Sequence, residues 1–391
     1  MRYLFYWLFM LSTLTAHGQR TGVAFQGGKW TEVLAAAKKA HKPVFFYAWS
    51  PSCSPCVGMS RDVFPDTAVA RYYNAHFVSY KANIDEGEGK ALSTRYGIRS
   101  LPAYLYFTAE GKPLHRSGGG KPAAEFIQDG QDALNPSKAY FALKDRYASG
   151  DRTAALLYAF SKAPGIAQEE ALHTQVTGEY LKTQSAQEMS SQKNLEYIFN
   201  QFLPYESLAT QYFLQHQAEF VPKFGQEAVT RKSRELISNA ANALGHKNDK
   251  VGLGNLQQSI ARLLPAQAKQ WQELAQVQYF MMQRNWPAYV DATLAYGQQF
   301  AAQDSFTLNY ATAILTAFVD DKALLAKGDQ IIQQAIAADR SHFYLLTRAK
   351  LLHKLGNDAD ASTAAMESIA AATKAGANHD EATEFLAEIK K

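Results

Sequence analysis

Cysteine is scarce in this chain, whose 391 residues include only Cys53 and Cys56. A framework of several disulfides is therefore excluded, and within one molecule each thiol can pair only with the other. A zinc site needs three or four protein ligands. No further cysteine or closely spaced histidine pair completes one, because His41, His76 and His115 are scattered. The sequence thus favours a redox pair over an inert remnant, and either of these over a metal site.

An excess of charge of one sign is also missing. The chain has 40 Lys and Arg against 36 Asp and Glu, and the two signs are interspersed along the sequence. Proteins that bind nucleic acids usually carry a basic stripe or patch, so we expect no nucleic-acid partner. Hydrophobic residues make up 47% of the chain, which is enough to build real cores.

The apolar run at the start of the chain is too short to cross a membrane, which takes about 20 apolar residues. The sequence there is MRYLFYWLFMLSTLTAHGQR, with Arg2 before the apolar run and small residues after it. Ala16 and Gly18 fit a cleavage site before Gln19, so we predict a signal peptide over residues 1–18. A membrane anchor is the alternative. We expect a mature protein that is periplasmic or otherwise exported and does not span a membrane.

Between residues 19 and 135, helical and strand-like patterns alternate. Apolar spacing and β-forming runs indicate which segments are which. The predicted helices cover 31–42, 57–76, 88–98 and 121–134, with a cap at Thr31, an interruption or kink at Pro65 and an end at Gly97. The predicted strands cover 43–49, 77–85 and an antiparallel pair over 101–120 that turns at Glu110 and Gly111. This segment therefore predicts an α/β domain.

The order of these elements, with Cys-Ser-Pro-Cys directly after a central strand, resembles the thioredoxin fold. The stretch YGIRSLPAYLYFTAEGK carries the resemblance beyond the cysteines. Pro102 matches the cis-proline of that family, and Gly118 or Gly119 matches the glycine after its last strand. The predicted fold class is an α/β thioredoxin fold followed by an all-α domain of helical hairpins, the latter over residues 136–391.

A cysteine at the start of a helix has a lowered thiol pKa, because free N–H groups and the helix dipole stabilise the thiolate. The resemblance implies that Cys53 is the exposed nucleophile and that Cys56, one turn later, is the resolving thiol. Pro55 would constrain the loop between them. Pro102, if cis, would lie opposite the pair and present the backbone of Leu101 to an extended client chain. No cofactor is implied.

The sequence departs from the thioredoxin pattern at three places. Thioredoxins have Trp directly before the first cysteine, whereas Ser52 stands here in a longer loop, so Trp49 would cover the site from a shifted position. Thioredoxins also have a buried Asp in their central strand. The matching position here is near Phe45, and the run VFFYAW contains no carboxylate. The proton of Cys56 must then pass to water or to Tyr47, or it has no local acceptor. Val57 follows the motif where thioredoxins have Lys.

Asp85, Glu86 and Glu88 form a small acidic cluster around two glycines. Such a cluster could bind a cation. The simpler interpretation is a solvated loop whose charges favour the start of the next helix. We therefore name no metal ligand.

From residue 136 onwards the strand-like runs stop, and apolar residues recur at helical spacing. Segments 143–162, 278–300 and 345–372 each indicate a helix, a tight turn and a second helix. The last resembles a tetratricopeptide unit, with small and large residues at the expected positions: Leu345, Ala349, Leu352, Gly356, Ala361, Ala365 and Ser368. A compact helical domain without repeats is the alternative.

Two functional hypotheses follow. In the first, the protein is an exported thiol–disulfide oxidoreductase that reduces or isomerises disulfides of client proteins. Its helical region would dock clients or a redox partner in the membrane or periplasm. In the second, the helical array binds a partner without catalysis, and the thioredoxin domain is a scaffold or a redox-controlled clamp.

Overall fold

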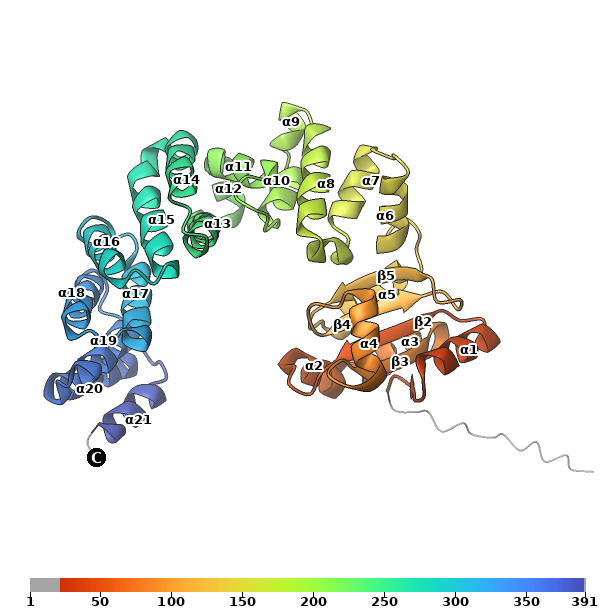
Figure 1. Cartoon of the computed structure of the whole chain (residues 1–391), viewed down its shortest axis with the longest axis horizontal. Helices are drawn as coiled ribbons and strands as arrows, with labels where there is room; N and C mark the ends of the chain where they lie inside the picture. The colour runs from red at the N-terminus through yellow and green to blue at the C-terminus, as the bar shows by residue number, and fades with distance from the viewer. Residues whose placement is uncertain (1–21, 390–391) are drawn as a thin grey trace, which may run out of the picture. The chain divides into compact units, whose positions relative to one another are not determined.

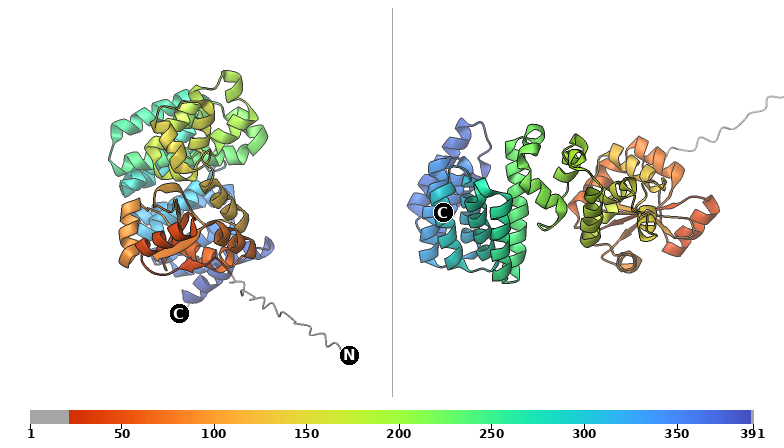
Figure 2. Two further views of the ribbon diagram at one scale, coloured as in Figure 1. Left: turned by 90° about the vertical axis from the view of Figure 1, so that its right-hand side faces the viewer. Right: turned by 90° about the horizontal axis from the view of Figure 1, so that it is seen from above.

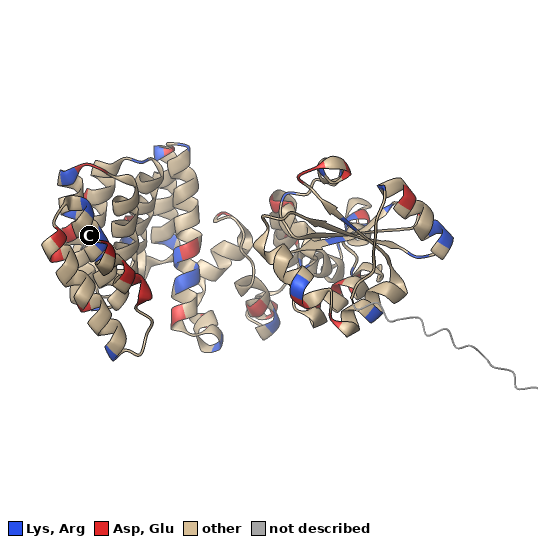
Figure 3. Cartoon of the chain, turned by 90° about the horizontal axis from the view of Figure 1, so that it is seen from below, with Lys and Arg blue, Asp and Glu red and all other residues tan. Residues whose placement is uncertain are grey.

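A computed structural model describes residues 22–389, so the predicted signal peptide lies outside the described residues. The chain divides into two compact units, one ending at Ser185 and the other beginning at Ala186. Positively and negatively charged residues are interspersed along the helices of both units (Figure 3). Within the part of the chain that is described, no helix combines the length and the apolar character of a membrane span.

The first unit begins with the predicted alternation of strands and helices (Figure 1). Its strands are β1 (Phe25–Gln26), β2 (Val44–Trp49), β3 (Val78–Asn83), β4 (Ala103–Phe107) and β5 (Pro113–Gly118). Its α/β part contains the helices α1 (Trp30–Ala40), α2 (Ser54–Gly58), α3 (Thr67–His76), α4 (Gly87–Tyr96) and α5 (Ala123–Ala133), together with a π-helical turn, η1 (Met59–Val63).

The strands form one sheet in the order β1-β3-β2-β4-β5. β3 runs parallel to both β1 and β2, whereas β2 and β4, and β4 and β5, are antiparallel. The register pairs Ala48 with Ala103, so the end of β2 lies beside the start of β4. Residues that follow β2 and residues that precede β4 therefore meet at one edge of the sheet.

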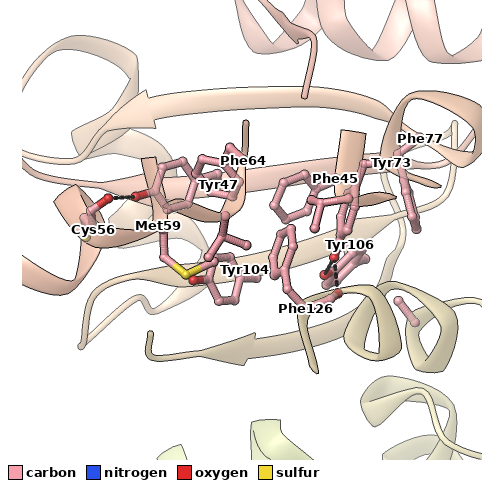
Figure 4. Packing of buried hydrophobic residues seen from close by; sticks show 13 residues of the cluster. Phe45, Tyr47, Cys56, Met59, Phe64, Tyr73, Phe77, Tyr104, Tyr106 and Phe126 are labelled. Carbon is pink, nitrogen blue, oxygen red and sulfur yellow. Dashed lines mark hydrogen bonds between the residues drawn. The ribbon is translucent and has the colours of Figure 1, made fainter. Parts of the chain in front are cut away.

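Side chains of the central strand β2 alternate between two cores. Val44, Phe46 and Ala48 pack with α1 and α4 on one face. Phe45 and Tyr47 pack on the other face, in an aromatic cluster with side chains from α3, α5 and η1 (Figure 4). Because both faces are covered, the strand is apolar along its whole length, as expected for a buried strand of such a sheet.

Several predicted boundaries agree with the structure, and two do not. Gly97 ends α4 with a φ of 60°, and Gly111 turns between β4 and β5 with a φ of 86°; glycine adopts these left-handed values without strain. The cap predicted at Thr31 is wrong, because α1 begins at Trp30 and its N-cap is Lys29. The helical segment predicted over 57–76 begins earlier, at Ser54 with α2, and is interrupted at Pro65, between η1 and α3, as predicted.

The compact first unit continues beyond the strands into α6 (Tyr140–Ala148), α7 (Ala154–Ser161), the short 3₁₀ turn η2 (Pro164–Gln168) and α8 (Glu170–Lys182). The backbone N–H of Tyr140 donates a hydrogen bond to Nδ1 of the buried His115 on β5, at 3.0 Å. A Cβ at Gly165 in η2 would lie 2.6 Å from the side chain of Arg116. The helices that follow residue 135 are thus tied to the sheet, and the domain boundary predicted at 135/136 stays a prediction.

The second unit consists of helices (Figure 1). The helices are α9 (Ala186–Met189), α10 (Gln192–Phe199), α11 (Leu208–Gln215), α12 (Gln217–Phe224), α13 (Gln226–His246), α14 (Lys250–Leu263), α15 (Ala268–Met282), α16 (Trp286–Phe300), α17 (Ser305–Phe318), α18 (Lys322–Ala338), α19 (His342–Leu355), α20 (Asp358–Lys374) and α21 (Asp380–Glu388), with a 3₁₀ turn, η3 (Pro265–Gln267), before α15.

Successive helices from α15 to α20 pack against one another as hairpins (Figure 2). In the hairpin of α19 and α20, the small and large residues predicted to pack are buried: Leu345, Ala349, Leu352, Ala361, Ala365 and Ser368. Gly356 ends α19 with a φ of 86°. The helical-hairpin architecture is confirmed, and membership of the tetratricopeptide family stays a prediction.

Candidate functional site

The two cysteines lie where β2 passes into α2. Cys53 is the N-cap of α2, and its Sγ accepts a hydrogen bond from the backbone N–H of Cys56 at 3.2 Å. The two residues form a disulfide with a Cα–Cα distance of 5.2 Å. Cys53 is half-buried, whereas Cys56 is only 1% exposed. An attacking group can therefore reach Cys53 and not Cys56, which is the difference the sequence predicts.

The longer loop before Cys53 is held by a carboxylate that sequence reasoning missed. The hydroxyl of the buried Ser50 donates to Asp85 at 2.5 Å and lies 2.9 Å from the hydroxyl of Ser52. The backbone N–H of Cys53 donates to the carbonyl oxygen of Ser50 at 3.1 Å. Trp49 is half-buried and packs on the aromatic cluster beside Cys53. The hydrogen bonds of Ser50 thus anchor the longer loop before Cys53 as a turn.

No carboxylate takes the place of the Asp that thioredoxins have in the central strand. Phe45 stands there, fully buried among aromatic rings (Figure 4). The Tyr47 hydroxyl donates to the backbone carbonyl of Cys56 at 3.2 Å. Burial raises the pKa of Tyr47 to about 12, against a smaller lowering by a hydrogen bond with Ser60. The phenol therefore stays protonated at neutral pH and cannot accept the proton of Cys56, which removes Tyr47 from the routes left open by the sequence.

The proline loop lies at the same edge of the sheet as the cysteines. The Leu101–Pro102 peptide bond is cis, and Leu101 packs half-buried between the two cores. The Gly119 N–H donates to the Pro102 carbonyl at 2.9 Å, and a Cβ at Gly118 would lie 2.8 Å from that oxygen. Both glycines considered from the sequence therefore lie against Pro102. Gly118 leaves space for the Pro102 carbonyl oxygen, and Gly119 donates a hydrogen bond to it.

The turn after β5 joins this edge to a buried polar network. A Cβ at Gly120 would lie 3.7 Å from the ring of Pro55. The next residue, Lys121, donates its backbone N–H to Sδ of Met59 at 3.3 Å, and its ammonium lies 2.9 Å from the buried carboxylate of Asp129. Tyr106, Ser117 and His115 also face that carboxylate: Tyr106 and Ser117 donate hydroxyl hydrogen bonds, and Nε2 of His115 lies 3.5 Å away.

The electrostatics of Asp129 follow from this network. Burial would raise the pKa of its carboxyl group, but His115, Lys121 and Ser117 outweigh burial and hold the pKa at about 2. Asp129 is therefore ionised across the physiological range. Sequence reasoning did not single out this residue, because its partners come from β4, β5 and the turn before α5.

The acidic cluster is exposed, with Glu86 as the N-cap of α4 and Glu88 in its first turn, as the interpretation of a solvated loop at a helix start predicts. Asp85 bonds to Ser50, Glu86 accepts from Asn83, and Glu88 accepts the backbone N–H of Trp30 at 2.7 Å. Each carboxylate thus has its own partner from another segment or turn. Among the described residues, no group of three or more His, Cys, Asp or Glu side chains is placed to hold a metal ion.

Comparison with known proteins agrees with the geometry. The sequence profile of the thioredoxin-like domain matches residues 30–133. A thioredoxin-like protein of Synechocystis is 30% identical over 105 residues, which are 26% of this chain and 90% of that protein. The M-type chloroplastic thioredoxin of Pisum sativum is 35% identical over 78 residues, 20% of this chain.

This chain covers only 41% of the length of that pea relative. Among solved structures, a thioredoxin from Thermus thermophilus is 26% identical, with 29% of this chain and 89% of that chain covered and a TM-score of 0.27. The family assignment rests on the profile and on the Synechocystis relative. Through residues 30–133, this chain belongs to the thioredoxin-like family.

Proposed function

We propose that the protein is an exported thiol–disulfide oxidoreductase that reduces, or isomerises, disulfides of client proteins. The observation that carries the proposal is the Cys53–Cys56 disulfide at the start of α2, with Cys53 accessible and Cys56 buried. The family match and the cis-proline loop beside the pair support the same chemistry.

The reaction balances as two thiol–disulfide exchanges. In the reduced enzyme, the Cys53 thiolate attacks one sulfur of the client disulfide, forms a mixed disulfide and releases the other client sulfur as a thiolate. The Cys56 thiolate then attacks Sγ of Cys53, which forms the enzyme disulfide and releases the second client thiolate. Two electrons pass to the client, and a dithiol redox partner must return them. Because the Tyr47 phenol is not a base at neutral pH, the proton of Cys56 passes to solvent.

A proline directly before the second cysteine is typical of reducing thioredoxins, so Pro55 favours the reducing direction. Clients would pair with the extended backbone at Leu101 beside the cis-proline. In an oxidising compartment the reduced state needs a dedicated donor, so we propose a membrane or periplasmic redox partner. Export itself is proposed from residues 1–18 alone, and N-terminal sequencing of the exported protein should begin at Gln19.

Trapping of a client tests the catalytic proposal. Reduced Cys56→Ser should retain insulin as a mixed disulfide on Cys53, because the resolving thiol is missing, and Cys53→Ser should retain none. Equal capture by both variants, or capture by neither, would contradict the assigned roles. The reduction potential of the wild-type pair then gives the direction: a value near about −270 mV supports a reductase, and one near about −120 mV an oxidant.

The second hypothesis, a binding module without catalysis, is supported by one observation in the helical unit, an exposed aromatic face on α17. The double variant Cys53→Ser, Cys56→Ser separates the two functions. Lost reduction of insulin with unchanged partner binding favours the binding module, and loss of both favours the enzyme.

A further inference from the structure

Helix α17 contains no charged residue, although one of its faces is open to solvent. Leu308, Ala311 and Leu315 are buried against the neighbouring helices. Phe306, on the opposite face, has a ring that is 56% exposed, and Phe318, the last residue of the helix, has a ring that is 60% exposed. Tyr310, at 43% exposure, lies between them in sequence and stacks on Phe306 with ring centroids 6.4 Å apart.

Exposed large aromatic side chains at helical spacing are unusual on a solvent-facing helix, where polar and charged residues are expected. Ala313 and Ala317 are exposed on the same helix. Their small side chains would let another chain approach the helix closely. Contiguous exposed apolar surface of this kind usually marks an interaction site. The rings of α17 therefore suit the binding of apolar side chains from a partner.

A pocket of about 210 Å³ adjoins this face within the second unit. Its walls come from α17, from the turn between α15 and α16, and from the end of α13. The lining residues are His246, Met281, Met282, Arg284, Trp286, Tyr310, Ile314 and Phe318. They include an arginine, a histidine and no carboxylate. Methionine and aromatic walls adapt to varied apolar side chains, and the guanidinium of Arg284 supplies a positive charge beside them.

Arg284 has a backbone conformation that glycine normally provides. It follows the end of α15 with a φ of 55°, in the left-handed region. Glycine is the usual residue at such a position, because a side chain there is strained. Glycine at this position would relieve the strain, so folding alone does not require an arginine there. A strained residue that also lines a pocket is a reason to look for function.

We propose that the exposed face of α17 and its pocket bind a polypeptide segment that combines apolar side chains with aspartate or glutamate. The apolar side chains contact Phe306, Tyr310 and Phe318, and a carboxylate pairs with Arg284. This inference rests on the docking role proposed above for the helical region and specifies its partner chemistry. It is independent of the cysteine chemistry, so the two can fail separately.

The test uses the full mature chain and two fluorescein-labelled synthetic peptides. One is rich in Leu, Phe and Asp, and the other has Asn in place of every Asp. Fluorescence anisotropy measures their binding. The acidic peptide should bind more tightly than its neutral analogue. Arg284→Gly should weaken the acidic peptide by about tenfold, as expected for a charged hydrogen bond, and leave the neutral analogue unchanged.

Arg284→Gly is also a control for folding, because it should leave the melting temperature unchanged or raise it. Phe318→Ser should weaken both peptides by about tenfold or more. Val251→Ser is the matched control, since Val251 is 76% exposed on α14 and does not line the pocket. It should change neither.

Three results would overturn the proposal. The first is no binding of the acidic peptide, and the second is equal loss of both peptides in Arg284→Gly. The third is a concentration-dependent dimer in light scattering that Phe318→Ser abolishes, which would make a second copy of this chain the occupant. Insulin reduction should be unaffected in the control variant Val251→Ser. Its loss in Cys53→Ser with intact peptide binding would show that the docking surface does not depend on catalysis.

Discussion

Strand β2 and helix α17 both lack charged residues, but they differ in how far they are buried. β2, with the sequence VFFYAW, is buried along Val44–Ala48, and only its last residue is partly exposed. α17, with the sequence SFTLNYATAILTAF, buries Leu308, Ala311 and Leu315, whereas Phe306, Tyr310 and Phe318 are exposed. Composition alone would place both in a core.

The difference comes from what surrounds each segment. Side chains of a strand alternate between two faces, and helices cover both faces of β2. A helix in a hairpin array has neighbours along part of its circumference only, so α17 keeps a face without cover in this chain. The absence of charge therefore accompanies burial in β2, whereas in α17 it accompanies exposed aromatic side chains.

Paired truncations give the largest expected effect. Phe45→Ala should lower the free energy of unfolding by about 3–5 kcal/mol, because Phe45 is fully buried among aromatic rings. Phe318→Ala should change it by less than about 0.5 kcal/mol, because the ring is 60% exposed. Urea denaturation followed by circular dichroism measures both. A similar loss of stability in the two variants would contradict the difference in burial between β2 and α17.

The next prediction concerns the buried charge of Asp129, which supports the sheet through Lys121 and His115. Its pKa is lowered from 3.8 to about 2 in the folded protein. The carboxylate therefore stabilises the fold above pH 4 by about 2 kcal/mol, and this contribution is lost as the pH falls through about 2.

Asp129→Asn should lose that amount at pH 7, and its difference from the wild type should shrink as the pH falls towards 2. Urea denaturation at several pH values checks this. A difference that is independent of pH would assign the loss to packing instead of charge.

A smaller loss than at Phe45 or Asp129 is expected at the Tyr47 hydroxyl of β2. Tyr47→Phe keeps the ring in the core and removes the hydrogen bond to the Cys56 carbonyl, which should cost about 1 kcal/mol of stability. Because the phenol is protonated at neutral pH, the pH profile of insulin reduction should keep its midpoint. A shifted midpoint would restore Tyr47 as a proton acceptor.

Prediction from the sequence succeeded where the signal is local. Gly97 and Gly111 mark turns whose left-handed backbone only glycine adopts easily. The end of β2 and the start of α2 place the cysteines without knowledge of distant contacts. Prediction missed the bond of Asp85 to Ser50 and the network around Asp129, because their partners are remote in sequence and the pairing depends on how the strands are ordered.

The sequence by itself determined that Cys53 and Cys56 can pair only with each other and that the first unit is an α/β fold of the thioredoxin type. Tertiary structure decided which carboxylate anchors the loop before Cys53 and which charge-free segment stays exposed. The physical reason is that burial depends on neighbours brought together by packing, whereas turns and helix starts depend on a few adjacent residues.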